Sequence, residues 1–147
     1  MTHQEIGSTY RETGAAGANQ FELVAMLYDV LLDDLRRAIQ AIRAGNVEAR
    51  SFELQHALRV LEQLQGSLNM EQGNEVAANL DRLYSIVRAK ILEAQWKVSG
   101  GILESQIKLL EPVRDAWKQA SQQNRTQVPP NVTVPLDAAA PTIELRT

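Results

Sequence analysis

The sequence contains no cysteine and few aromatic residues. Without cysteine, the chain has neither a disulfide framework nor a thiolate metal site. Because aromatic residues make up only 5% of the chain, leucine, isoleucine, valine and alanine must build its hydrophobic core. Neither sign of charge dominates: the formal net charge is −3 over 147 residues, which offers no general attraction to nucleic acid or to anionic lipid.

Long apolar runs are also missing. No stretch approaches the roughly 18 consecutive apolar residues that indicate a membrane-spanning helix. The first ten residues, MTHQEIGSTY, lack a basic segment followed by an apolar run and therefore do not resemble a Sec-type signal peptide. We expect a cytoplasmic protein without membrane insertion, built as one domain with a tail.

The most distinctive segment is the apolar helix predicted around residues 20–34. Its apolar side chains recur at the three- and four-residue spacing that places them on one helical face: Leu23, Leu27, Val30, Leu31 and Leu35. Val24, Met26 and Tyr28 widen this face beyond what packing against a single neighbour needs. The pattern predicts either a helix central to a bundle or a helix shared between the core and a partner.

Turn and capping residues divide the chain into four helices of about 20 residues each. The first is expected to follow Asn19, a good N-cap, and to end near Gly45, which suits a left-handed C-cap. Asn46 and Asn74 are candidate caps of the second and third helices, and Ser99 to Gly101 mark the third turn. Short connections between helices of this length predict an all-α fold, an antiparallel up-down four-helix bundle over residues 19–123.

Prolines and small residues mark the ends of the bundle. Pro112 lies inside the fourth helix, where we expect a kink or a break near Leu109. Four of the five prolines fall in 124–147, which has no helical period and is predicted to be a disordered or extended tail. Residues 1–18 are polar, with two larger side chains spaced for one short amphipathic turn, Ile6 and Tyr10.

Catalytic and metal-binding patterns are weak. Glu53 and His56 form one E-x-x-H pair, but a di-iron bundle needs that motif twice, and the other histidine is His3. The acids of the first helix are followed directly by Arg36 and Arg37, a pattern typical of a solvated face with local pairing: Asp29, Asp33 and Asp34. We find no nucleophile with a base, no phosphate-binding loop and no basic stripe. The sequence therefore predicts no enzyme activity, no cofactor, no metal and no nucleic-acid partner.

Apolar residues beside the main stripes remain to be explained. They exceed the inner seam of a small bundle: Val24, Tyr28, Val76, Tyr84 and Ile86. Each one is equally compatible with packing at the flank of the core. Together they favour grooves between helices that accept an apolar segment of a partner.

Several motifs, taken in order, resemble the flagellar export chaperone FliS family over residues 6 to 120. The matching features are an N-terminal tyrosine at Tyr10, LVAMLYDVLLDDLRRAI at 23–39, the turn Gly45–Asn46, a Ser-Leu-Asn segment at 67–69, GNEVAANLDRLYSIVRAKILEA at 73–94, and Trp117 late in the last helix. The resemblance implies a helical-bundle chaperone, not an enzyme. It would bind the disordered C-terminal segment of flagellin in the cytoplasm, before delivery to the flagellar type III export apparatus.

Under this resemblance, a client-binding groove is expected at Leu27, Tyr28, Leu61, Asn79, Leu80, Leu83, Tyr84 and Val87. Tyr28 and Tyr84 would be half-buried, with polar tips at the groove. Asn79 would hold a backbone amide of the client, or else tie down the loop between the second and third helices. Ile6 and Tyr10 would cover the groove until the client displaces them.

Two other readings stay open at this point. A regulatory or scaffold bundle would bind a folded flagellar or secretion partner stoichiometrically, and the resemblance leaves open whether flagellar regulators bind as well. A metal-bundle oxidase would require bound iron or manganese.

Overall fold

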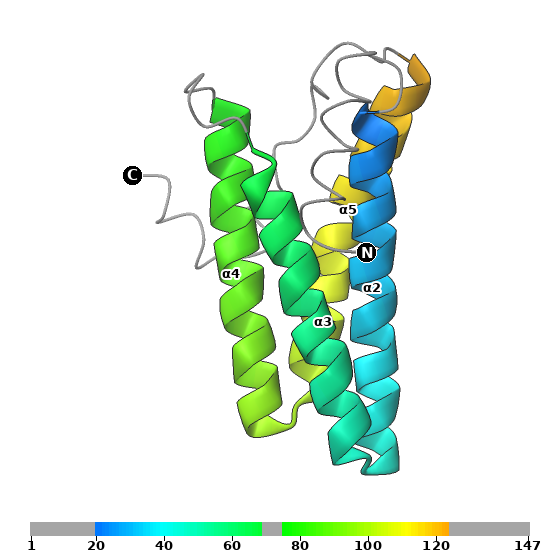
Figure 1. The fold of residues 1–147 in the computed structure, drawn as a ribbon, viewed down its shortest axis with the longest axis vertical. Coiled ribbons are helices and arrows are strands. Elements are labelled where there is room, and N and C mark those ends of the chain that lie inside the picture. Colours follow the sequence, from blue (N-terminus) through cyan, green and yellow to red (C-terminus); the bar gives the residue numbers. More distant parts are fainter. Residues whose placement is uncertain (1–19, 69–74, 124–147) are drawn as a thin grey trace.

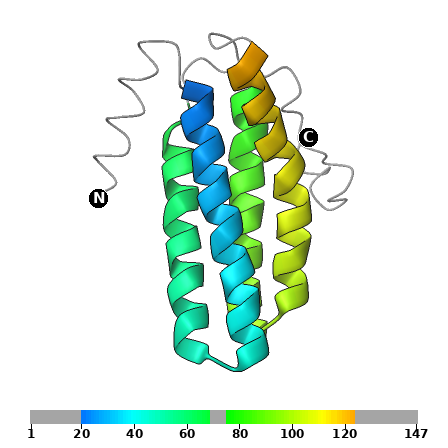
Figure 2. The same cartoon turned by 90° about the vertical axis from the view of Figure 1, so that its right-hand side faces the viewer.

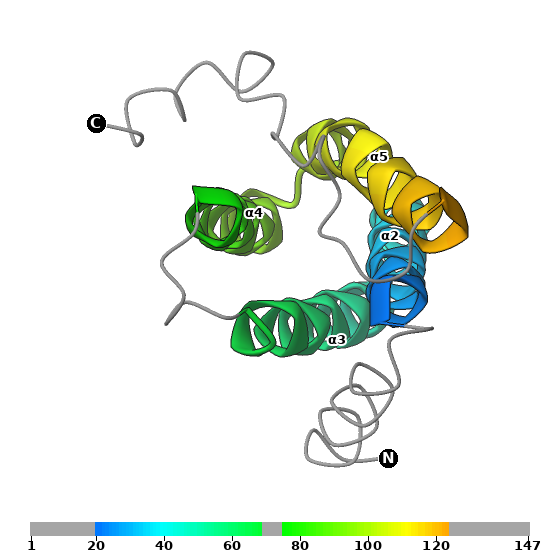
Figure 3. The same ribbon diagram turned by 90° about the horizontal axis from the view of Figure 1, so that it is seen from above.

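The computed structural model describes residues 20–68 and 75–123, which form four helices (Figure 1). These are α2 (Gln20–Ala44), α3 (Val47–Gly66), α4 (Glu75–Lys97) and α5 (Gly100–Gln123). Successive helices run in opposite directions, and seen from above they follow one another around a ring (Figure 3). The predicted antiparallel up-down bundle is therefore confirmed. The predicted N-terminal cap (1–18) and tail (124–147) lie outside the described residues.

α2 occupies the most buried position in the bundle. It packs along both α3 and α5, while α4 lies diagonally across from it and contacts its own two neighbours less extensively (Figures 2 and 3). Its buried side chains cover more than one face, from Phe21 and Val24 through Leu31 and Leu35 to Ile39. No helix within 20–68 or 75–123 is long and apolar enough to cross a membrane.

The turn between α2 and α3 follows the predicted capping chemistry. Gly45 adopts a φ of 69°, and the Asn46 amide donates to the Ala41 carbonyl oxygen at 2.9 Å, which closes the end of α2. The Asn46 side chain then accepts a hydrogen bond from the Ala49 amide at 3.0 Å and so begins α3. Both predicted roles are confirmed.

The turn between α4 and α5 uses the same geometry with an unfavourable residue. The Ser99 amide donates to the Ala94 carbonyl oxygen at 3.1 Å, and the residue between them, Val98, has a φ of 55°. A β-branched residue is strained in this left-handed region, which costs an L-residue about 1–2 kcal/mol. The Ser99 hydroxyl accepts from the Ile102 amide at 3.2 Å and caps α5.

Substituting the equivalent residue in each of these two turns gives a matched test. Val98→Gly is expected to raise the free energy of unfolding by about 0.5–1 kcal/mol, because relief of the strain exceeds the extra entropy of glycine in the unfolded chain. Gly45→Ala is expected to lower it by about 1 kcal/mol for the opposite reason. Urea denaturation of both variants measures the two changes. A destabilised Val98→Gly chain would contradict this account.

The fourth helix does not break at its proline. α5 continues from Gly100 to Gln123 through Pro112, so the predicted break near Leu109 is wrong. Proline removes the amide that would bond the carbonyl of Lys108, four residues earlier. Pro112 and Lys108 are both exposed, so water can hydrate that carbonyl while the helix continues.

Candidate functional site

Six of the eight predicted groove residues lie in the core. Each of them is at most 1% exposed: Tyr28, Leu61, Leu80, Leu83, Tyr84 and Val87. The expected half-burial of the two tyrosines is therefore wrong, because α2 and α4 turn them toward each other across the interior. Contact between these six residues and a client stays a prediction. In the free chain it would require the helices to separate.

The two tyrosines hydrogen-bond each other inside the bundle. Their hydroxyl oxygens lie 2.8 Å apart, and their rings lie 6.2 Å apart at 59°. Burial raises the pKa of Tyr28 well above its ordinary range, although the hydrogen bond with Tyr84 opposes this. Trp117 lies in the same part of the core, 5.7 Å from the ring of Phe21. Its buried indole N–H has no partner at hydrogen-bond geometry in the described part of the chain, although its interaction with the Tyr28 side chain also lowers the pKa of that tyrosine.

Removing one of the two hydroxyls should cost more than removing both. Tyr84→Phe leaves the Tyr28 hydroxyl buried without its partner and is expected to lower the free energy of unfolding by about 1–3 kcal/mol. Adding Tyr28→Phe removes the orphaned group and should recover part of that loss. Urea titrations of the two single variants and the double variant measure the coupling. Strictly additive losses would show that the hydrogen bond contributes nothing.

The other two predicted residues are accessible. Asn79 is partly exposed on α4, and its side-chain oxygen accepts from Arg82 one turn later at 3.0 Å. Leu27 is partly exposed on α2 and packs against the edge of the core. Of the predicted set, Leu27 is the residue that belongs to an exposed apolar surface of α2.

An exposed apolar strip runs along the first half of α2. It consists of Leu23, Met26, Leu27 and Val30, and we call it the α2 strip. Met26 is 55% exposed and Val30 is 38% exposed, while Leu23 and Leu27 are partly buried. The spacing i, i+3, i+4, i+7 places the four side chains on one face. This face adjoins the inner face of α2 at Leu27, which also packs against the core, so the apolar surface of the helix extends from the core to solvent.

The strip lies on the side of α2 that faces α3. Asp34 and Arg37 contact α3, and Val30, Leu27 and Leu23 precede Asp34 by about one, two and three turns. Because α3 is antiparallel, the residues beside the strip are those that follow His56, including the buried Val60. From helical spacing alone, Leu23, Leu27 and Val30 fall on one broad face with the core residues Leu31 and Leu35.

A polar network marks the lower end of the α2 strip. His56 Nδ1 lies 2.6 Å from Asp34 Oδ2, Arg37 donates to Asp34 Oδ1 at 2.8 Å, and Arg37 Nε donates to Glu53 at 3.2 Å. Asp34 is fully buried, so its predicted place on a solvated face is wrong. Of the E-x-x-H pair on α3, His56 therefore contacts the buried carboxylate of Asp34 directly, and Glu53 contacts it through Arg37. No cluster of three potential metal ligands occurs in the described ranges.

The burial of Asp34 predicts a pH dependence of stability. Desolvation raises the pKa of this carboxyl above its ordinary 3.8, although His56 and Arg37 oppose the shift. The folded chain therefore holds this proton more tightly than the unfolded chain does. As the pH rises from 3.8 through the raised pKa of the folded state, ionisation of Asp34 lowers the free energy of unfolding. The free energy of unfolding of the native chain, minus that of Asp34→Asn, should therefore decrease as the pH rises above 3.8. Urea titrations across that range measure it, and a rising difference would contradict the assignment.

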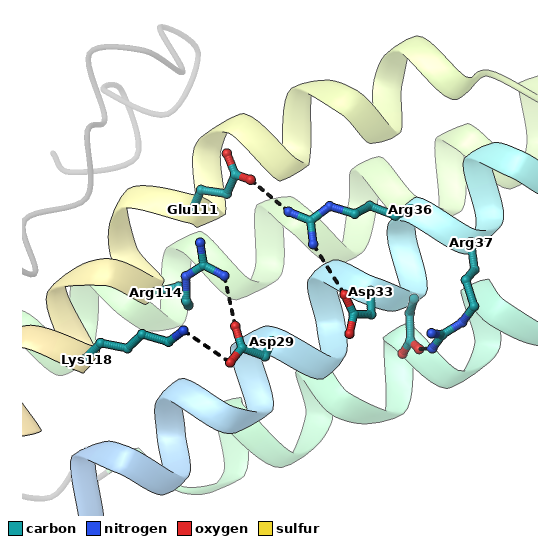
Figure 4. A network of polar contacts seen from close by, with 8 residues as sticks. Asp29, Asp33, Arg36, Arg37, Glu111, Arg114 and Lys118 are labelled. Atoms are coloured by element: carbon teal, nitrogen blue, oxygen red, sulfur yellow. Dashed lines mark hydrogen bonds and ion pairs between the residues drawn. The ribbon is translucent and has the colours of Figure 1, made fainter.

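The opposite side of α2 is closed by ion pairs with α5 (Figure 4). Asp29 accepts from Arg114 at 2.9 Å and lies 3.4 Å from Lys118, while Arg36 bridges Glu111 at 2.8 Å and Asp33 at 3.3 Å. Partial burial opposes ionisation of Asp29, but Arg114 and Lys118 outweigh it and lower its pKa. The predicted local pairing holds for Arg36 and Asp33, whereas the contacts to α5 were not foreseen. The open apolar side of α2 is therefore the one toward α3.

Comparison with known proteins places this chain in a family. The family model described as "Flagellar protein FliS" matches residues 2–124. The chain belongs to the FliS family. A relative from Salmonella typhimurium named flagellar secretion chaperone FliS is 31% identical over 111 residues, which cover 75% of this chain and 82% of the relative. A relative of the same name from Bacillus subtilis is 30% identical over 125 residues, covering 85% and 92%.

Membership confirms the resemblance drawn from the sequence motifs. The FliS relatives are named as flagellar secretion chaperones, and the chain is accordingly a member of a chaperone family and not of an enzyme family. The α2 strip lies within the 23–39 motif on which that resemblance rested. The strip therefore combines part of this motif with exposed apolar side chains.

Proposed function

We propose that this chain is a cytoplasmic export chaperone for flagellin. It binds the disordered C-terminal segment of flagellin, prevents premature polymerisation and supports delivery to the flagellar type III export apparatus. The observation that carries the proposal is the half-exposed α2 strip inside the family's 23–39 motif. An apolar surface of this kind is kept on a soluble protein when a partner covers it.

The shape of the strip suits an amphipathic client. Four apolar side chains at helical spacing can pack against the apolar face of a segment that becomes helical as it binds. The client's ordering reduces the net affinity, which favours a complex that holds the segment and still releases it. Arg37 and Glu53, at the lower end of the strip, are charged groups that can fix the register of the client.

The N-terminal segment is proposed to guard this surface. Ile6 and Tyr10 are four residues apart, the same spacing as Met26 and Val30, so one helical turn would place both against the strip. The client would then displace this segment by offering more apolar area. Both residues lie outside the described ranges.

Calorimetric titration with a peptide of the C-terminal segment of flagellin from the same organism tests the proposal. We expect one-to-one binding with a negative heat-capacity change, and a gain of helicity followed by circular dichroism. Absence of binding at tens of micromolar peptide, with the chain fully folded, would overturn it. The alternative, a regulatory or scaffold bundle, would then be tested by capture of a folded flagellar or secretion partner.

A further inference from the structure

A second exposed apolar surface lies at the other end of the bundle. It consists of Val47, Leu92, Trp96 and Val98, and we call it the α4 patch. Trp96 is 81% exposed, and the other three are 45–58% exposed. Leu92 and Trp96 are one turn apart on α4. The Gln95 amide nitrogen donates to the Ser51 hydroxyl at 2.9 Å, and this register places Val47, one turn earlier on α3, at the same end as Val98.

Basic side chains outnumber acidic ones around the patch, where Arg50, Arg88 and Lys97 lie near Glu48 and Glu93. Arg50 donates to the Gln95 side-chain oxygen at 3.1 Å, and Arg88 lies one turn before Leu92. Neither arginine has a carboxylate partner in the part of the chain that the structure describes. Lys97, by contrast, is paired with Glu93 at 2.9 Å. The patch therefore suits an occupant that combines apolar side chains with carboxylates.

The backbone supports a role for this surface. Val98 holds an exposed apolar side chain in a left-handed conformation that glycine would adopt at less cost. The structurally equivalent position at the end of α2 is Gly45. Strain is thus retained where the side chain extends the patch.

We propose that residues 136–145 of this chain cover the α4 patch. Their sequence, LDAAAPTIEL, offers three large apolar side chains together with two carboxylates: Leu136, Ile143, Leu145, Asp137 and Glu144. These are the two chemical classes that the patch suits. The apolar residues cover Trp96 and Leu92, and the carboxylates pair with Arg88 and Arg50.

The length of the intervening chain matches the distance to be crossed. α5 runs antiparallel to α4 and ends at Gln123, so the chain leaves the bundle about 36 Å from the patch, from the 24 residues of α5 at about 1.5 Å each. Residues 124–135 contain Pro129, Pro130 and Pro135, and proline-rich chains favour an extended form of about 3.1 Å per residue. Twelve such residues span about 37 Å, which brings Leu136 level with the patch. Because the segment is tethered, a few contacts suffice to hold it.

Acrylamide quenching of tryptophan fluorescence in the full-length chain tests this proposal. The variant L136S/I143S/L145S should uncover Trp96 and raise its quenching constant about twofold, since covering one face of an indole shields about half of its area. The matched control V128S/V132S/V134S changes three apolar residues of the spacer and should leave quenching unchanged. The variant W96F isolates the signal of Trp96 from that of the buried Trp117.

Equal quenching of Trp96 in the native chain and in L136S/I143S/L145S would overturn the proposal. So would shielding that grows with protein concentration, because the occupant would then be a second copy of the chain. Shielding that is independent of concentration and lost only in L136S/I143S/L145S supports it. Flagellin peptide is absent from this experiment, so its outcome does not depend on the proposed chaperone function.

Discussion

Replacing Met26 and Val30 with lysine is expected to weaken binding of the flagellin peptide roughly 100-fold while the melting temperature hardly changes. Both side chains are exposed in the free chain, so their removal costs the fold little. Lysine is a good helix former, and Glu22 and Asp33 lie within one turn to accommodate the new charges. In the complex, the same two ammonium groups would be desolvated against an apolar client. Calorimetric titration measures the affinity, and thermal unfolding measures the stability.

A matched control for this experiment lies on α3. Phe52 is 62% exposed, and Gln55 is also exposed, one turn further along the helix. The variant F52K/Q55K adds the same charge outside the α2 strip and should leave peptide affinity unchanged. If both double variants weaken binding equally, the effect comes from net charge. The strip would then not be the binding surface.

Leu83→Ala is expected to lower the free energy of unfolding by about 2–5 kcal/mol. Leu83 was predicted from the sequence as a groove residue, but it is 1% exposed and belongs to the central apolar cluster. Truncation leaves a cavity that the surrounding side chains cannot fill. Peptide affinity, measured at a temperature where the variant is still folded, should remain close to that of the native chain. Urea denaturation and calorimetric titration together separate the two effects.

The opposite outcome for Leu83→Ala would support the prediction from the sequence that Leu83 lies in the client-binding groove. An unchanged melting temperature with a weakened complex would mean that Leu83 contacts the client directly. The bundle would then have to open between α4 and its neighbours on binding. That is the side on which the helices contact each other least extensively.

Local chemistry made the architecture predictable from the sequence. Gly45 and Asn46 form the turn that their conformational preferences indicate, and the helices they separate have the expected directions. The continuity of α5 through Pro112 was not predictable in the same way. Whether a proline interrupts a helix depends on whether water reaches the freed carbonyl, and this is known only once the packing is known.

The inner and outer faces of α2 could not be told apart from the sequence. Helical spacing relates both groups of apolar side chains: the strip residues Leu23, Leu27 and Val30, and the buried residues Val24, Tyr28, Leu31 and Leu35. Periodicity shows that a face is apolar but does not show which neighbouring helix covers it. The wide stripe was predicted to serve either the core or a partner. The positions of α3 and α5 were needed to divide it into a buried part and an exposed part.

Asp34 illustrates the same limit for polar residues. Its neighbours Asp33 and Arg36 are solvent-accessible, and nothing local distinguishes it from them except its spacing from Leu31 and Ala38 on the buried face. The residue that compensates its burial, His56, is 22 positions away on another helix. A buried carboxylate is therefore identified through a contact between distant segments, which a single sequence does not supply.

The methyl resonance of Met26 tests the central claim most directly. The chain has three methionines, and Met26 is the one that lies within the described residues, on the α2 strip. With methyl-labelled methionine, the Met26 signal can be assigned by its loss in Met26→Leu and followed while flagellin peptide is added. We predict that this signal shifts in proportion to binding and saturates at one peptide per chain. Saturated binding with an unmoved Met26 signal would place the client elsewhere and contradict the account.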